Sequence, residues 1–312
     1  MKELIFLEPV LKECIWGGDR LSEFGYRLPS DSVGECWAIS AHPNGDCLIK
    51  GGLYDGMHLS TLWDTHRELF GGLTAEHFPL LIKIIDAKRD LSIQVHPDDA
   101  YAALHENGAS GKTECWYILD CDENATIVIG HRAGTKEEAE RLVKEGKWSD
   151  FIREIPVHKG DFFQIEPGVV HAIKGGTVLL ETQQNSDITY RVYDYDRLQN
   201  GVRRELHLEK SLSVIGIPFR ECALERKVLP VKGAVCEELI CCRYYSVERW
   251  EISGETVLPG TSTFRNVSVV NGEGKLGGFP VAKGTNLLIP CTYGECVAEG
   301  NMELICSTIE KV

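Results

Sequence analysis

Two polar side chains in one short segment could bind a metal ion together. In LSIQVHPDD, residues 91–99, apolar and polar residues alternate as in a β-strand, which Pro97 would end. Because successive side chains of a strand point to opposite faces, Gln94 and His96 would point the same way. A neutral imidazole is a good zinc ligand, and an amide oxygen is a weaker one. The alternative is a structural histidine that hydrogen-bonds to the aspartates after it.

A lysine and a carboxylate lie two residues apart in GKTECW, residues 111–116. Glu114 begins an apolar run, where a carboxylate is costly to bury unless it meets a cation. Lys112 would lie on the same face if the strand begins that early. On this segment alone, a solvent-exposed Lys–Glu pair, which contributes little to stability, is the simpler interpretation.

A second histidine follows a turn in GDFFQIEPGVVHAI, residues 160–173. A strand-like run ends at Pro167 and Gly168, and His171 comes directly after the turn. This order of strand, turn and histidine is similar to the second metal-binding motif of cupins, although the spacing differs from the common form. The pattern makes His171 a candidate metal ligand from a different strand than His96.

Charged residues in two further segments could bind an anion. The polar stretch at 181–197 contains Arg191, whose guanidinium can hold a phosphate or an oxyanion through two parallel hydrogen bonds. Asp187 could act as an acid or base, or could orient Arg191, and the orienting role is the one that the pattern favours. Lys83 lies inside the apolar run LLIKIID and should therefore have a partner, either a phosphate or Asp86.

Short strands must position these residues, because apolar runs of strand length alternate with glycines and other turn signals. The runs cover 80–86, 115–119, 125–131, 161–167 and 176–183. Two segments favour helices instead. They are 60–70 and 135–153, and in the second we expect Thr135 to cap the N-terminus and Gly146 to divide the segment into two helices.

The chain changes character near residues 215–232, where two prolines and the lack of a clear period indicate a connector. Short strands with glycine turns follow, as is typical of a small antiparallel barrel or sandwich. This tail contains no histidine, since the last one in the chain is His207. We therefore expect a metal-binding domain over 1–215, a connector over 216–229 and a second β domain over 230–312.

Composition limits the class of protein. With 43% hydrophobic and 26% charged residues, the 312-residue chain resembles a folded globular protein. A net charge of −14 argues against nonspecific nucleic-acid binding, which depends on a surplus of Lys and Arg. We expect neither a signal peptide nor a membrane-spanning helix, since no apolar stretch is long enough. Twelve scattered cysteines without a CxxC pair favour reduced thiols in a cytoplasmic protein.

Taken together, six segments closely resemble the type I mannose-6-phosphate isomerases, particularly their short bacterial form, and follow in that family's order. The segments are WGG (16–18), GECWAIS (34–40), FPLLIKIIDAKRDLSIQVHPDD (78–99), GKTECW (111–116), PGVVHAI (167–173) and QNSDITYRVYDYDR (184–197). They lie in the first two-thirds of the chain, and the last third matches only in its β character. The resemblance implies a mainly β fold, with a cupin-type jelly-roll barrel, a few helices and a second, smaller β domain.

The resemblance also implies a reaction, the interconversion of mannose 6-phosphate and fructose 6-phosphate through an enediol. It implies one zinc ion bound by His96, Glu114 and His171, with Gln94 as a further ligand. The zinc would polarise the carbonyl and hydroxyl oxygens of the substrate as a Lewis acid. Arg191 would be catalytic, because its fixed charge can stabilise the developing enediolate.

Some assignments stay open at the level of sequence. The base that moves the proton could be Asp187, Lys112, a histidine or a zinc-bound water. The candidates for binding the phosphate are Lys83, Ser92 and Lys112. The expected partner is a small phosphorylated sugar rather than a nucleic acid or a membrane, and the sequence does not determine the oligomeric state.

Two other functions fit part of the pattern. Two histidines and a carboxylate could hold iron in an oxygenase. A cupin without catalytic activity could bind a sugar as a sensor or a storage protein. Lys112 and Arg191 beside the metal ligands favour an anionic sugar over oxygenase chemistry, and a sensor would not need Arg191.

Overall fold

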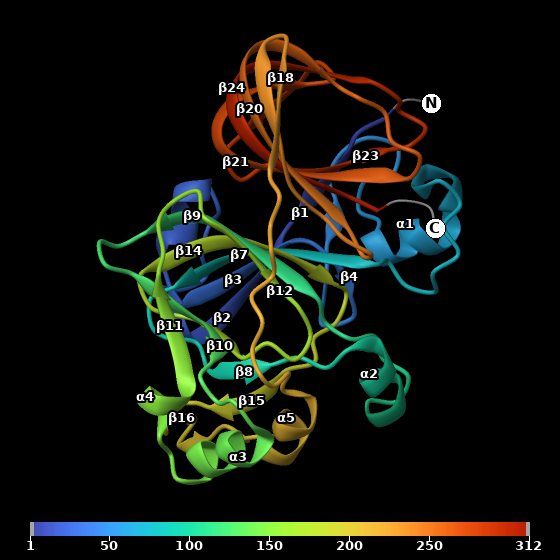
Figure 1. Cartoon of the computed structure of the whole chain (residues 1–312). Helices are drawn as coiled ribbons and strands as arrows, with labels where there is room; N and C mark the ends of the chain where they lie inside the picture. Colours follow the sequence, from blue (N-terminus) through green and yellow to red (C-terminus); the bar gives the residue numbers. More distant parts are fainter. Residues whose placement is uncertain (1–2, 310–312) are drawn as a thin grey trace.

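The computed structural model describes residues 3–309. Figure 1 shows two β-rich halves, with the C-terminal strands forming the upper one and most of the first two-thirds of the chain forming the lower one. The mainly β fold expected from the sequence is confirmed.

Two antiparallel sheets face each other in the lower half. The order of strands in the first is β12 (Phe162–Ile165), β9 (Glu114–Cys121), β14 (Thr177–Gln184), β7 (Leu80–Ala87), β2 (Val10–Gly18) and β3 (Val33–Ile39). The order in the second is β11 (Ile152–Pro156), β10 (Thr126–His131), β13 (His171–Ile173), β8 (Ile93–Val95) and β15 (Tyr190–Tyr193). Apolar side chains of both sheets, among them Trp116, Leu179, Ile127 and Ile173, fill the space between them in one cluster. The two sheets therefore enclose a common interior.

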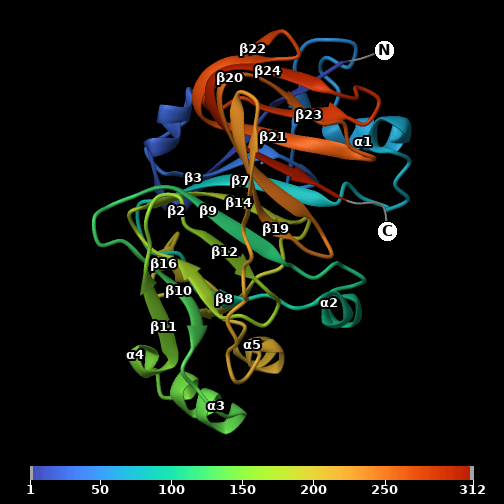
Figure 2. The same ribbon diagram turned by 45° about the horizontal axis from the view of Figure 1, so that its top comes forward.

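Short helices cover the outer face of the five-stranded sheet. They are α3 (Lys136–Lys144), α4 (Trp148–Phe151) and α5 (Leu208–Val214), and Figure 2 shows them below the sheet. Leu142 and Phe151 of these helices pack in one cluster with Ile93, Val95 and other residues from that face. The residues that alternate with these along the strands therefore point to the other face of the sheet, toward the six-stranded sheet.

The predicted helical segments are confirmed. Residues 135–153 form α3 and α4, separated at Gly146, and the hydroxyl of Thr135 accepts a hydrogen bond from the backbone of Glu138 at 3.2 Å. Residues 60–70 form α1 (Leu59–Thr65) and the 3-10 helix η2 (Arg67–Phe70). The pattern did not reveal α2 (Asp99–His105), α5 or the 3-10 helix η1 (Arg20–Phe24), which are short.

The Thr135→Ala variant should unfold at a Tm lowered by about 2 °C, because removing an N-cap hydroxyl costs about 1 kcal/mol. Thr135→Ser keeps the hydroxyl and should melt like the original protein. Thermal unfolding followed by circular dichroism measures both variants, and equal melting temperatures for all three proteins would show that the cap contributes nothing.

The upper half is a single nine-stranded antiparallel sheet. Its main path is β18 (Lys227–Val231), β19 (Ala234–Cys241), β20 (Ser246–Leu258), β24 (Cys296–Thr308), β21 (Phe264–Leu276), β23 (Asn286–Pro290), β1 (Ile5–Glu8) and β6 (Leu48–Ile49), and β22 (Phe279–Ala282) pairs with β21. Two small pairs complete the fold: β4 (Ala41–His42) with β5 (Gly45–Asp46), and β16 (Leu198–Gln199) with β17 (Val202–Arg203).

The expected connector is shorter than predicted, because residues 227–229 belong to strand β18. Proline usually argues against a strand, since it cannot donate to the ladder. It is tolerated on an edge strand, however, and Pro230 stands in β18 at the edge of the sheet. The division of the chain into domains at 1–215 and 230–312 stays a prediction. It must accommodate β1 and β6, which pair within the upper sheet.

The two halves share an apolar core. Trp63 of α1 packs edge-on against Phe78 at 5.5 Å, and Phe264 of β21 lies 5.2 Å from Phe78, measured between ring centroids. All three rings are fully buried. This shared core holds the upper half against the lower one. No helix within residues 3–309 combines the length and the apolar character that crossing a membrane requires.

Candidate metal centre and active site

Two histidines and a glutamate converge inside the lower half. Nε2 of His96 lies 3.1 Å from Nε2 of His171. The Glu114 carboxylate lies against both, with Oε2 3.4 Å from Nε2 of His96 and Oε1 3.3 Å from Nε2 of His171. All three side chains are at most 1% exposed. Their potential ligand atoms all lie within 4.8 Å of one another, which is close enough to share one metal ion.

Strand alternation aims these residues inward from two sheets. Ala172 of β13 packs under the helices, so His171 beside it points into the interior. In β9, Trp116 belongs to the interior cluster, and Glu114, two residues earlier, shares its face. The histidines therefore come from the five-stranded side and the carboxylate from the six-stranded side.

Gln94 joins the cluster as its position predicted. Ile93 and Val95 on either side pack toward the helices, so Gln94 points inward. It stands directly opposite His171 in the β8–β13 pairing, and its Nε2 lies 3.2 Å from Nε2 of His171. Turning the amide about its own axis would present its oxygen at the same place. Gln94 is thus within reach of an ion held by the other three.

The chemistry of these side chains fits a metal ion. Nδ1 of His171 donates to the carbonyl of Val169 at 2.9 Å, which leaves a lone pair on Nε2. Burial, and next the neighbouring Lys112, lower the pKa of His96 to about 3, so its imidazole is neutral at pH 7. Within residues 3–309, both buried oxygens of Glu114 lack a hydrogen-bond partner of good geometry. Two neutral imidazoles and a carboxylate with free lone pairs match the donor set of zinc sites.

Lys112 stands beside the cluster rather than on the surface. Its ammonium lies 2.9 Å from Oε2 of Glu114, and the lysine is 4% exposed. The solvent-exposed pair that the segment alone suggested is therefore wrong. Burial by itself would raise the pKa of Glu114, but Lys112, and next His96, outweigh it and hold that pKa well below its usual range. The carboxylate is therefore ionised.

Lys83 is buried, but Asp86 is not its partner. Lys83 lies 3.5 Å from Glu181 and 3.8 Å from Glu35, and its ammonium is 5.2 Å from the centre of the Trp37 ring. Asp86 stands three residues further along β7, where alternation turns it to the opposite face. It accepts a hydrogen bond from a backbone N–H elsewhere, that of Arg20 at 2.8 Å.

Glu181 is a site residue that we did not predict. It lies opposite Lys83 in the β14–β7 pairing and accepts a hydrogen bond from Nε1 of Trp116 at 3.0 Å. Burial, and next the negative charge of Glu114, raise its pKa. A carboxylate at the end of the apolar run VLLE was the available signal. Like Lys83, a charged side chain next to apolar residues should have a partner of opposite charge.

Arg191 points into the same interior. It stands opposite Gln94 in the β15–β8 pairing, one strand away from the cluster. One of its Nη atoms donates to the carbonyl of Glu205 at 2.8 Å, and its buried Nε has no hydrogen-bond partner in the part of the chain that the structure describes. Burial, and next the nearby Arg204, lower the pKa of Arg191. Within the described residues, no carboxylate lies within ion-pair distance of this guanidinium.

Asp187 does not orient Arg191, contrary to the role that the sequence favoured. Its exposed carboxylate accepts a hydrogen bond from the Asn44 side chain at 3.1 Å. Ser92 is buried and precedes β8, where alternation gives it the same face as Gln94.

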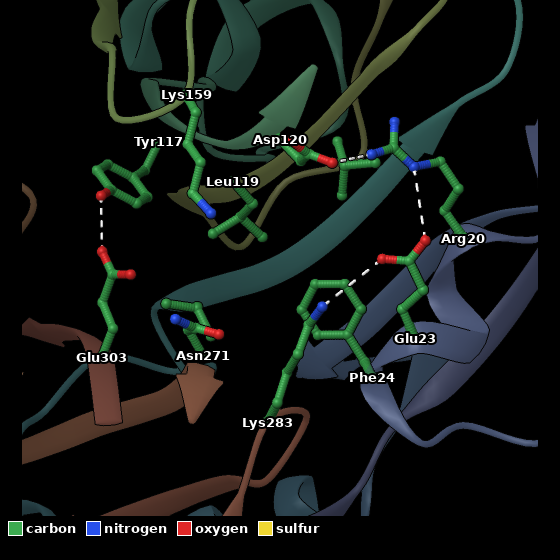
Figure 3. Close-up of a pocket in the computed structure, with 12 residues that line it drawn as sticks. Arg20, Glu23, Phe24, Tyr117, Leu119, Asp120, Lys159, Asn271, Lys283 and Glu303 are labelled. Atoms are coloured by element: carbon green, nitrogen blue, oxygen red, sulfur yellow. Dashed lines mark hydrogen bonds and ion pairs between the residues drawn. The ribbon is translucent and has the colours of Figure 1, made fainter. Parts of the chain in front are cut away.

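A cavity of about 220 Å³ lies elsewhere, between the two halves. Figure 3 shows its lining, in which Arg20 is paired with Asp120, and the hydroxyl of Tyr117 donates to Glu303 at 2.8 Å. Its lining shares no residue with the cluster around Glu114. This cavity and the candidate metal ligands are therefore separate sites.

Comparisons with known proteins identify one family over nearly the whole chain. The family model "Phosphomannose isomerase type I, catalytic domain" matches residues 4–120, and "Mannose-6-phosphate isomerase, cupin domain" matches residues 236–309. The mannose-6-phosphate isomerase ManA of Bacillus subtilis is 48% identical over 98% of both chains. The mannose-6-phosphate isomerase of Streptococcus mutans is 44% identical over 98% of both chains.

A solved structure shows the same architecture. The crystal structure of a mannose 6-phosphate isomerase from Bacillus subtilis superimposes with a TM-score of 0.97 at 45% identity, over 99% of this chain and 100% of that one. Together with the cupin-domain match, this confirms the cupin-type fold that the sequence predicted.

Proposed function

The chain belongs to the type I phosphomannose isomerases and interconverts mannose 6-phosphate and fructose 6-phosphate, and on this premise we propose which residues do the chemistry. A single zinc ion is held by His96, Glu114 and His171, with Gln94 as a further ligand. The observation that carries this proposal is the convergence of two neutral imidazoles, through their Nε2 atoms, on a buried and ionised carboxylate.

Zinc is preferred over iron because of the groups around the cluster. Two histidines and a carboxylate also suit the iron of an oxygenase. The fixed cations that stand beside this cluster, Lys112 and Arg191, nevertheless favour an anionic sugar substrate over oxygenase chemistry. When bound, a zinc ion would polarise the oxygens on the two carbons between which hydrogen moves.

The protein's own residues would stabilise the developing negative charge and transfer the proton. Among residues 3–309 no carboxylate pairs with Arg191, so its guanidinium is available to an oxyanion that forms beside Gln94. For the proton, Asp187 and Lys112 stay candidates. Glu181 joins them because its pKa is raised by burial and next by Glu114.

For substrate binding we propose Lys112, Ser92 and Asp187, with Lys83 in a supporting place. Lys83 already lies near two carboxylates, so it is less available to a phosphate than the sequence suggested. Asp187 is exposed, and its hydrogen bond to Asn44 would hold it at the surface of the site.

The test is a coupled assay that follows fructose 6-phosphate formed from mannose 6-phosphate, with and without a chelator. Activity should disappear on chelation and return with zinc, and metal analysis of the active protein should find one zinc per chain. Full activity in a metal-free preparation would contradict the proposal. Oxygen consumption that depends on iron would instead support the oxygenase alternative.

A cytoplasmic location is a further part of the proposal. All twelve cysteines are free. Burial raises the pKa of Cys47 to about 12, so it is a poor thiolate at neutral pH. Free thiols suit a reducing compartment. Fractionation of cells that produce the protein at its natural level tests this location.

A further inference from the structure

The turn between β19 and β20 brings two tyrosines of the upper half into the lower half. The hydroxyl of Tyr244 donates to Oδ2 of Asp99 at 2.7 Å, and the hydroxyl of Tyr245 donates to Oε1 of Gln164 at 3.2 Å. Figure 2 shows β19 extending down toward α2, which Asp99 begins. Gln164 stands opposite Cys115 in the β12–β9 pairing. Both contacts therefore end beside the segment that carries Glu114.

Asp99 holds three partners from separate parts of the chain. Besides Tyr244 on Oδ2, its Oδ1 accepts the backbone N–H of Gly111 at 2.9 Å and the side-chain amide of Gln184 at 3.0 Å. Hydrogen bonds to an ionised carboxylate are shorter and stronger than those between neutral groups. Asp99 thus links the upper half to a set of hydrogen bonds that holds the backbone of residues 111–113, which we call the clamp.

The clamp accounts for every backbone N–H of that segment. Gly111 donates to Asp99, Lys112 donates to the carbonyl of Pro97 at 3.1 Å, and Thr113 donates to Oε1 of Gln184 at 2.8 Å. A Cβ at position 111 would meet backbone atoms of residues 98 and 99 at 2.5 Å, so glycine permits this close approach. This backbone positions Lys112, which belongs to it, and Glu114, which follows it directly.

Tyr244 remains a hydrogen-bond donor across the neutral pH range. Burial, and next its bond to Asp99, raise the pKa of Tyr244 to about 12. Its ring is half-buried at the junction of the halves, and Arg243 lies over it at 5.5 Å from the ring centre. The hydroxyl therefore fixes one oxygen of Asp99 while the other holds the clamp.

We propose that Tyr244 is a positioning residue for the isomerase reaction, acting through Asp99 and Gln184 on Lys112 and Glu114. The upper half supplies no member of the histidine–glutamate cluster, and on this proposal it sets the geometry of that cluster. The proposal rests on the function proposed above. Without the Tyr244 hydroxyl, Asp99 loses the partner that fixes its Oδ2, which loosens the hydrogen bonds that its Oδ1 accepts from Gly111 and Gln184.

The test compares Tyr244→Phe with Tyr293→Phe in the zinc-loaded full chain. Both remove one hydroxyl from the upper half, but Tyr293 takes part in none of these hydrogen bonds. For Tyr244→Phe we expect kcat to fall about 3- to 30-fold with little change in KM, below the ~10²-fold cost of a 1 Å misplacement. Zinc should pass to a chelator severalfold faster. Tyr293→Phe should leave kcat and zinc transfer unchanged.

Hydrogen exchange separates positioning from a general loss of stability. The amides of Gly111 and Thr113 should exchange about tenfold faster in Tyr244→Phe, while amides of β10 and β20 keep their rates. Asp99→Asn, which keeps the shape of the side chain but removes its charge, should reproduce both effects. Unchanged exchange at 111–113, equally faster exchange everywhere, or faster exchange at 111–113 with normal kcat would each overturn the proposal.

The two proposals fail in different ways. If the original protein does not isomerise mannose 6-phosphate, the proposed function fails at once. The exchange rates and the transfer of zinc to a chelator still report, without any substrate, whether Tyr244 holds the segment at 111–113.

Discussion

The Glu114→Gln variant should lose its bound metal and at least about 10³-fold of its isomerase activity. A metal ion contributes several kcal/mol of transition-state stabilisation, and each 1.36 kcal/mol is a factor of ten in rate. Glutamine keeps the size of the side chain but offers a neutral amide. It also leaves Lys112, whose ammonium lies 2.9 Å from Oε2 of Glu114, as an uncompensated cation next to the ion.

Metal analysis and kcat measured on the same preparation check this expectation. A matched control is Glu154→Gln, because Glu154 also pairs with a lysine, Lys174 at 3.1 Å, but on the surface and away from the cluster. The control should keep its zinc and its turnover. A Glu114→Gln protein with full zinc and near-normal kcat would show that the carboxylate is not a ligand.

The Arg191→Ala variant should lose about 10²- to 10³-fold of kcat, as is typical when one fixed group that stabilises developing charge is removed. Its zinc content should stay nearly the same, because Arg191 contacts none of the three cluster side chains. Arg191→Lys should recover only part of the activity, since an ammonium cannot reproduce the planar fork of a guanidinium.

The competing role for Arg191 is a brace in its loop. The carboxylate best placed for such a brace, that of Asp194, is already bound by Arg197 and Arg204. Arg191 itself donates to a backbone carbonyl, that of Glu205. A brace would lower Tm and leave turnover near normal at low temperature. Measuring kcat, zinc content and Tm on one sample separates the two roles, and normal kcat with a lowered Tm would exclude catalysis by Arg191.

Local patterns in the sequence determined the strands and the orientation of several site residues. In LSIQVHPDD the alternation of side chains placed Gln94 on the inner face, because Ile93 and Val95 on either side had to be buried elsewhere. The helix cap at Thr135 and the break at Gly146 could also be predicted from the sequence, because each depends only on residues within one helical turn. The motifs around His96 and His171 indicated that the two histidines come from different strand segments, but not that these segments belong to one sheet.

Contacts between distant segments were decided only by the tertiary structure. Whether Lys112 lies on the surface or is buried depends on the other strands that enclose it, and its own segment favoured the surface. Lys83 was expected near Asp86, three residues away, but its partners are Glu35 and Glu181 on neighbouring strands. Alternation excluded Asp86, yet only the pairing of β7 with β14 and, in addition to the main strand order, with β3 brings those two carboxylates beside Lys83.

The relation between the two halves was equally invisible in the sequence. A period of two residues tells which face a side chain takes, but not which strand lies beside it, so nothing local indicated that β1 pairs with β23, more than 270 residues later. The hydrogen bond from Tyr244 to Asp99 likewise joins residues 145 positions apart. Short motifs in the sequence indicated which side chains do the chemistry. The contacts that hold those side chains in place join segments that are far apart in the sequence, and only folding brings these segments together.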